Sequence, residues 1–187
     1  MRWWRLDYPA EVDLEKVRDI VEGVEIESEE RTVYVTVKRG TAFCGRPVHV
    51  WEITLRGRYV DDGRAVLTHW IVEERHTTSI STLGFATFFP EAVRPFKTPH
   101  AERRRMANEA ARELEKVSRA VRVKTRFGDI WDVHLEEIKE WLDRGIPVWF
   151  YECRECGRAA FTTTARGRCT ACGSPVEPVE VTPEDLQ

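Results

Sequence analysis

Four cysteines in the last quarter of the chain have the residue type and the spacing of a metal site. They form two C-x-x-C-G motifs separated by 12 residues, and they are Cys153, Cys156, Cys169 and Cys172. A C-x-x-C turn brings two thiolates within reach of one tetrahedral ion, and the glycine after it permits the tight turn that aims peptide N–H groups at sulfur. Two such turns complete a Cys₄ shell, so the sequence predicts one zinc ion. Because a closed shell has no position for a substrate, this zinc is predicted to be structural.

Two alternatives to a zinc site use the same cysteines. Proteins of hyperthermophiles form cytosolic disulfides, but one ion explains two matched turns more simply. A zinc deaminase carries an H-x-E…P-C-x-x-C signature, and His134-Leu135-Glu136 upstream of Cys153 resembles its first half. However, Glu152 stands where that signature has proline, and a deaminase leaves the second cysteine pair unexplained. The sequence therefore favours a structural Cys₄ site.

The segment 149–179 resembles the zinc-ribbon superfamily. The resemblance rests on the two cysteine turns, on the strand pattern Trp149-Phe150-Tyr151 before the first turn, and on 159–165 after it. Zinc ribbons occur in transcription factors, RNA polymerase subunits, ribosomal proteins, recombination proteins and many enzymes, so the resemblance implies a fold rather than a task. The domain organisation that we predict is an α+β main domain, a zinc ribbon and an acidic tail, at residues 1–147, 148–180 and 181–187.

Strand patterns fill the first half of the chain. Residues 48–59 and 65–74 are rich in β-branched and aromatic side chains and flank Asp61-Asp62-Gly63, which predicts a hairpin. Residues 24–27 and 32–38 predict two further strands. In the second of these, valines alternate with polar residues, so the valine face is expected to point inward.

Helical spacing is clearest after Pro99, where apolar residues recur at intervals of three and four: Ala107, Ala110, Ala111, Leu114, Val117 and Val121. Shorter helices are predicted from about residue 10 to 21 and from 133 to 144. The fold class that we predict is α+β: a meandering antiparallel sheet packed by one long helix, with a C-terminal zinc ribbon.

The sequence lacks the common enzyme motifs. The five histidines do not form H-E-x-x-H, and neither G-x-S-x-G nor a phosphate-binding glycine loop is present. His69 and His76 share a predicted strand with two glutamates, so an enzyme with a site near these histidines and the Ser/Thr-rich loop 77–89 is the third interpretation. A protein without a catalytic site is the preferred one.

Arginines indicate a partner. The formal net charge of −3 conceals acidic ends, with −6 over residues 1–30 and −4 over 174–187, and a basic middle, with +3 over 31–75 and +4 over 76–132. Guanidinium groups contact phosphates, so we predict association with DNA or RNA. The candidate binding residues are Arg103, Arg104, Arg105, Arg154, Arg158, Arg166 and Arg168.

These arginines and the ribbon predict a nucleic-acid-associated protein that acts within a nucleoprotein complex in recombination, transcription or defence. Residues 31–120 are similar in their order of elements to the annealing core of single-strand annealing recombinases, with a hairpin, a Ser/Thr-rich segment and an alanine-bearing helix from Pro99. That resemblance implies a basic groove along a hairpin. The alternative is a protein–protein docking or structural subunit of a larger assembly, with the ribbon as the docking element.

Composition also suggests a source and a location. The chain has one asparagine and one glutamine, and arginine outnumbers lysine 23 to 6, which is typical of a thermophile protein. No stretch approaches the roughly 20 apolar residues of a membrane helix, and Arg2 and Arg5 interrupt the N-terminal aromatic residues. We therefore expect a cytoplasmic protein without a membrane partner.

Overall fold

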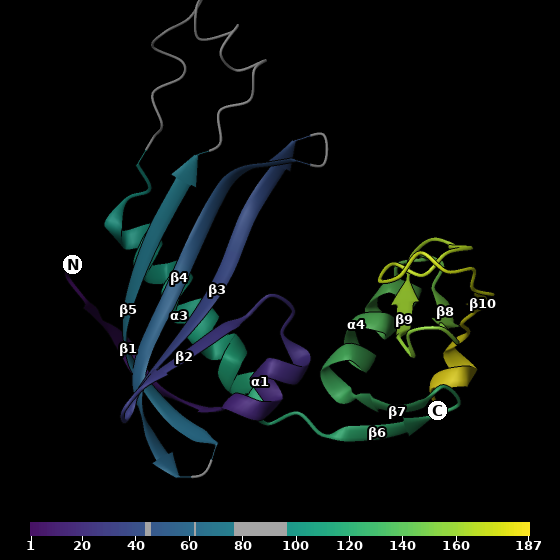
Figure 1. Ribbon diagram of the computed structural model, residues 1–187, viewed down its shortest axis with the longest axis horizontal. Helices are drawn as coiled ribbons and strands as arrows, with labels where there is room; N and C mark the ends of the chain where they lie inside the picture. Colours follow the sequence, from purple (N-terminus) through teal and green to yellow (C-terminus); the bar gives the residue numbers. More distant parts are fainter. Residues whose placement is uncertain (44–45, 62, 77–96) are drawn as a thin grey trace, which may run out of the picture. The chain divides into compact units, whose positions relative to one another are not determined.

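The structure is a computed structural model that describes residues 1–43, 46–61, 63–76 and 97–187. The chain divides into two compact units, Met1–Arg119 and Ala120–Gln187, whose elements are labelled in Figure 1. The division lies nearer the N-terminus than the boundary at 147/148 that the sequence suggests. Each unit has its own hydrophobic core and is described separately below.

A five-stranded antiparallel sheet forms the first unit, with the strand order β1-β5-β4-β3-β2. Its strands are β1 (Trp4–Asp13), β2 (Glu25–Glu29), β3 (Thr32–Phe43), β4 (Arg46–Asp61) and β5 (Arg64–His76). The long strands β3, β4 and β5 follow one another as antiparallel neighbours (Figure 1). The predicted mixed α+β class and the large antiparallel sheet are confirmed.

The start of the first helix differs from the prediction. Residues Ala10 to Asp13 extend β1 and pair with β5, and α1 (Leu14–Ile20) begins only after them. Asp13 is the N-cap, and its side chain accepts a hydrogen bond from the Lys16 peptide N–H at 3.2 Å. The helix therefore begins where a capping side chain is available, and the residues before it satisfy their backbone groups in the sheet.

One face of the sheet packs against two helices, α1 and α3 (His100–Ser118). Their apolar side chains join alternate residues of the strands in one core, which contains Leu14, Val17, Val33, Val35, Ile53, Leu55, Ala107, Ala110 and Leu114. The valine face of β3 points inward as predicted, but the packing is shared by two helices rather than provided by one. Among the described residues, no helix is long and apolar enough to span a membrane.

A β-bulge between β4 and β5 decides which β5 residues face the core. Leu67 pairs with Gly57 and His69 pairs with Arg56, so Thr68 is the extra residue. The bulge lets Leu67 and Trp70, which are three apart, both enter the core, while His69 lies on the opposite face. Glycine is required at position 57, because a Cβ there would lie 2.0 Å from the Val66 carbonyl oxygen.

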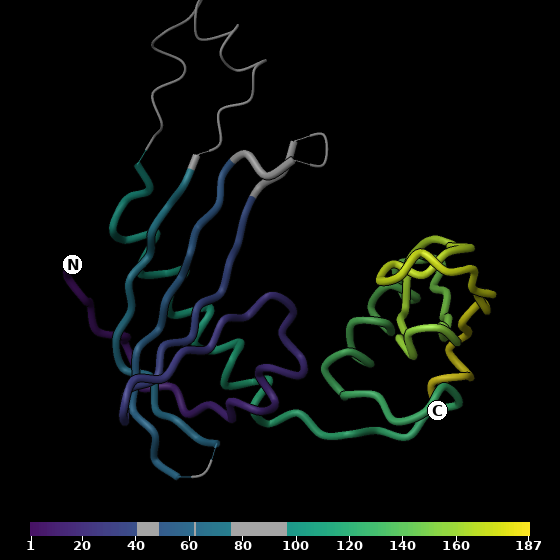
Figure 2. Tube along the Cα trace, viewed as in Figure 1, coloured from purple at the N-terminus to yellow at the C-terminus, as the bar shows by residue number. Residues whose placement is uncertain are grey.

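In the second unit, a hairpin of β6 (Arg122–Thr125) and β7 (Gly128–Trp131) leads into α4 (Asp132–Asp143). A three-stranded sheet follows with the order β10-β8-β9, from β8 (Trp149–Glu152), β9 (Ala159–Thr162) and β10 (Val179–Glu180), and a 3₁₀ helix, η1 (Pro183–Leu186), ends the chain. Figure 2 traces this path in green to yellow.

The core of the second unit explains why α4 belongs to this unit. It joins Leu135 and Ile138 of α4 to Val148 before β8 and to Val181 and Leu186 near the C-terminus. The stretch 181–187, which the sequence suggests is an acidic tail, thus contributes two buried apolar side chains, 3% and 2% exposed. The stretch that contains β8 and β9, the helix α4 and the chain end share one core.

Candidate metal centre and basic surfaces

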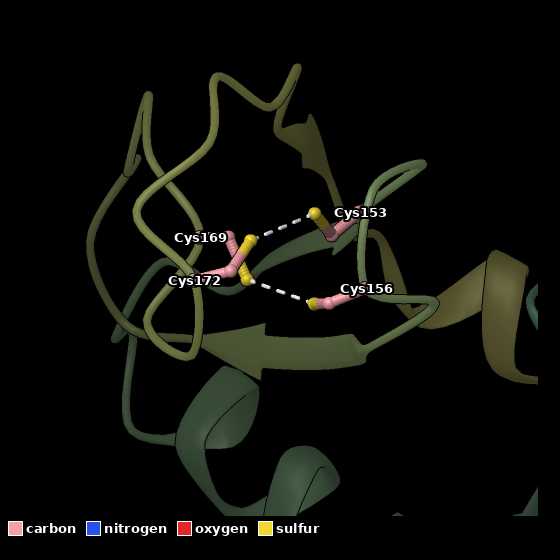
Figure 3. A group of neighbouring side chains, drawn as sticks. All are labelled: Cys153, Cys156, Cys169 and Cys172. Atoms are coloured by element: carbon pink, nitrogen blue, oxygen red, sulfur yellow. Dashed lines mark hydrogen bonds between the residues drawn. The ribbon is translucent and has the colours of Figure 1, made fainter.

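The four predicted cysteine ligands come together in the second unit. Their sulfur atoms all lie within 4.8 Å of one another, and two turns present them from opposite sides (Figure 3). The Sγ–Sγ distance is 3.5 Å between Cys153 and Cys172 and 3.6 Å between Cys156 and Cys169. In a tetrahedral site with Zn–S bonds of about 2.3 Å, neighbouring sulfurs are about 3.8 Å apart. The cluster can therefore hold one metal ion.

The two cysteine turns have the same backbone geometry. In the first, the Gly157 N–H donates to the Cys153 carbonyl at 2.9 Å, and in the second, the Gly173 N–H donates to the Cys169 carbonyl at 3.0 Å. Both glycines have positive φ, 72° and 75°, which side chains rarely adopt. The glycines after each cysteine pair are thus needed for the turns, as the motif predicts.

Peptide N–H groups favour negative charge on the second pair of sulfurs. The N–H groups of Cys172 and Ala171 lower the pKa of Cys169 to about 6, and the Ser174 side chain and N–H lower the pKa of Cys172. The Arg158 N–H favours the Cys156 thiolate, but burial and the other three thiols together raise its pKa to about 12. Hydrogen bonds therefore stabilise the thiolate forms of Cys169 and Cys172, and the thiolate is the form that binds a cation.

Tyr151 of β8 supports the cysteine turns, a role that its place in a predicted strand does not indicate. It is 1% exposed and packs with Cys153, Cys169 and Val176 in a small core. Its hydroxyl accepts a hydrogen bond from the Thr170 N–H at 3.1 Å. Strand β8 therefore positions both turns, since Cys153 follows it directly and Tyr151 anchors the second turn. The available signal was a large aromatic residue two positions before the first cysteine.

The arginines predicted at the helix end are all paired with carboxylates. Arg103 donates to Glu74 at 3.0 Å and to two backbone carbonyls, and its side chain is only 18% exposed. Arg104 pairs with Asp7, and Arg105 pairs with two glutamates of its own helix. The structure places these arginines close together, but their charges are compensated, and Arg103 ties α3 to β5.

The ribbon arginines have a different environment. All four are exposed beside the cysteine turns, namely Arg154, Arg158, Arg166 and Arg168. The Arg168 guanidinium donates to the Gly173 carbonyl at 3.2 Å. Within the part of the chain that the structure describes, neither Arg154 nor Arg166 forms an ion pair. The charges of Arg154 and Arg166 therefore remain available to an anionic partner.

The two histidines of the enzyme interpretation do not meet. His69 pairs with Arg56 near the middle of β5, and His76 pairs with His49 at its end. Seven residues of extended chain separate them by roughly 23 Å. The loop 77–89 lies outside the described residues. The pKa of His69 is lowered by burial and then by the nearby Arg56 and Arg5, so this ring is neutral at pH 7.

Comparisons with protein-family models, with curated proteins and with solved structures find no match to this chain.

Proposed function

We propose that this chain is a non-enzymatic, nucleic-acid-associated protein whose Cys₄ cluster holds one structural zinc ion in a zinc ribbon. It acts within a nucleoprotein complex, in recombination, transcription or defence. The metal part is supported by four sulfurs that lie within 4.8 Å of one another on two matched turns, since a Cys₄ shell is complete without a substrate or water ligand.

The observation that carries the nucleic-acid part is the contrast between the two arginine groups. The three predicted arginines at the start of α3 are paired with carboxylates, whereas Arg154 and Arg166 on the ribbon are exposed and pair with no described carboxylate. An exposed guanidinium gains most from a phosphate when no carboxylate competes for it. The ribbon is therefore the proposed contact with the nucleic acid backbone.

The test compares binding of the zinc-containing protein and a ribbon variant to labelled DNA and RNA at several salt concentrations. The variant replaces Arg154, Arg158, Arg166 and Arg168 with alanine. If each arginine neutralises one phosphate, the slope of log K against log salt falls in magnitude by about 3 for single strands. A matched control replaces four exposed arginines elsewhere, Arg18, Arg31, Arg112 and Arg144. Equal affinities for the wild type and the ribbon variant would remove the main support for this proposal.

A second candidate function, docking to a protein partner, is favoured by a pocket in the second unit. Its volume is about 330 Å³, and its lining includes Phe127, Trp131, His134, Trp141 and Phe161. A concave aromatic surface of this size accepts one apolar anchor residue of a partner. The two functions respond differently to salt: a partner held in this pocket stays bound in about 1 M salt, where the Debye length is about 3 Å and phosphate contacts are screened.

A further inference from the structure

The sheet of the first unit has a second face, opposite the core that α1 and α3 cover. The register places Arg5 opposite His69, His69 opposite Arg56, and Arg56 opposite Tyr34. Paired residues project to the same side of a sheet, so these four side chains form one row across β1, β5, β4 and β3. With strands about 4.8 Å apart, the row is about 14 Å long.

Two aromatic side chains lie on this face without belonging to a core. The ring centroids of Trp3 and Tyr34 are 5.9 Å apart, and the Arg56 guanidinium lies 4.7 Å from the Trp3 ring centroid. The hydrophobic core of the unit includes Trp4 and Trp70 but neither Trp3 nor Tyr34. Core packing therefore does not explain these two rings, which remain partly exposed on the sheet surface.

The arginines of this face are not neutralised. Within the described ranges, Arg5, Arg56 and Arg58 form no ion pair, whereas the nearby Lys38 and Arg75 are paired with Glu25 and Glu52. Arg58 lies two residues after Arg56 on β4, so its side chain projects to the same face and adds a positive charge beside the row.

The charges on and beside this face also determine which part of it attracts an anion. The lowered pKa of His69 has burial as its main cause, and the positive charges of Arg56 and Arg5 add to it. At the far end of the row, Glu27 on the edge strand β2 is opposite Tyr34. An anion is therefore attracted to the part of the face around Arg5, Arg56 and Arg58, and repelled from the β2 edge.

We propose that this surface, the Trp3 face (Trp3, Arg5, Tyr34, Arg56, Arg58 and His69), binds single-stranded nucleic acid. Bases stack on Trp3 and Tyr34, and the phosphates between them contact the arginines. Bases of a duplex are already stacked on one another and cannot reach these rings, so the face selects single strands. This inference rests on the proposed function, and it adds a second surface, in the other compact unit, and a substrate class.

The experiment measures equilibrium binding of the full zinc-containing chain to a labelled oligo-dT, an oligo-U and a hairpin duplex. Trp3→Ala and Tyr34→Ala are each expected to weaken single-strand binding about 5- to 150-fold, the range that corresponds to one stacking contact, and to leave duplex binding unchanged. Arg5, Arg56 and Arg58 replaced together by glutamine lower the single-strand salt slope by about 2.

Two control variants separate stacking from folding. Trp3→Phe keeps an aromatic face and is expected to retain most of the single-strand affinity. Tyr8→Ala removes an aromatic residue of β1 that is 74% exposed, and this variant is expected to bind like the wild type. Circular dichroism of each variant confirms that the sheet is intact before its binding is compared.

The outcomes distinguish this inference from the proposed function. If the wild type binds none of the three probes at about 50 mM salt, both fail together. If the wild type binds but Trp3→Ala and Tyr34→Ala bind single strands equally well, the Trp3 face is not the site, and the proposed function still stands. Equal losses for single strands and duplex would overturn the assignment of single strands as the ligand.

Discussion

Removal of the metal from the Cys₄ cluster is expected to unfold residues 153–173 and to leave the five-stranded sheet intact. The perturbation is either a chelator or the variant Cys172→Ser, which removes one of the four sulfur ligands. The sheet is expected to survive because its core, with Ile53 and Leu55 fully buried, belongs to the other compact unit. The two units therefore respond separately to the same treatment.

The expected magnitude follows from the small core beneath the cysteine turns. Ordering about 20 residues costs roughly 20 kcal/mol at about 1 kcal/mol per residue. Burial of Tyr151 and Val176, 1% and 9% exposed, contributes about 5 kcal/mol. The difference of about 15 kcal/mol lies within the roughly 10–16 kcal/mol that a structural zinc ion supplies. Without the metal, the ordered segment is therefore unfavourable by about 15 kcal/mol.

Hydrogen exchange measured by mass spectrometry tests this reasoning. Peptides from 153–173 are expected to lose protection in the chelated protein and in Cys172→Ser, while peptides from β4 keep theirs. The matched control is Ala171→Ser. This exposed position lies between Cys169 and Cys172, and the substitution leaves all four thiols in place. Full protection of 153–173 in a preparation shown to be free of metal would refute both the magnitude and the structural role of zinc.

Three further perturbations test the fold and its electrostatics. Gly57→Ala is expected to lower the free energy of unfolding by about 3 kcal/mol or more, because its Cβ would lie 2.0 Å from a backbone oxygen of β5. The pKa of Asp185 is lowered to about 2, chiefly by the Thr182 N–H and then by Arg126, so the contribution of this carboxylate to the stability of the second unit is fully present above about pH 4 and is lost toward pH 2. His69, whose pKa is lowered, is expected to titrate below 6.5 in an NMR experiment, and its contribution destabilises the native state as the pH falls below that value.

Each of these predictions has its own control. Gly167→Ala places a Cβ in open space and is expected to have little steric effect. Asp185→Asn is expected to flatten the acid limb of the stability curve, and an unchanged curve would show that this carboxylate does not cause it. Arg56→Gln is expected to raise the pKa of His69, and a titration that does not move would mean that Arg56 exerts no influence on the ring.

The cluster of four cysteines and the valine pattern of β3 could be predicted from the sequence because both depend on local geometry. A C-x-x-C-G turn closes over five residues, so its two sulfurs are placed by the backbone between them, whatever the rest of the fold does. Val33 and Val35 alternate with polar residues, and alternation in a strand determines which side chains share a face. The meeting of the two cysteine turns is the nonlocal part of this prediction, and the matching form of the two motifs indicates it.

The start of α1 could not be predicted in the same way. The spacing of apolar residues is similar before and after Asp13, with Val12 on one side and Leu14 and Val17 on the other, so periodicity shows no boundary between strand and helix. The boundary is set by pairing of Ala10 to Asp13 with β5, a strand that lies more than 50 residues later in the chain. Such pairing depends on the register of the whole sheet, including the bulge at Gly57.

The sequence by itself determined that arginines are abundant and where they stand along the chain, but not which of them are free to bind a partner. Arg103 is paired with Glu74, and Arg104 with Asp7, across sequence separations of 29 and 97 residues. These pairs compensate the two charges, so they are not free to bind a partner. The same folding brings Trp3 beside Tyr34 and under Arg56. Charge and aromatic content are properties of the chain, whereas compensation and exposure are properties of neighbours in space, and only the tertiary structure determines those neighbours.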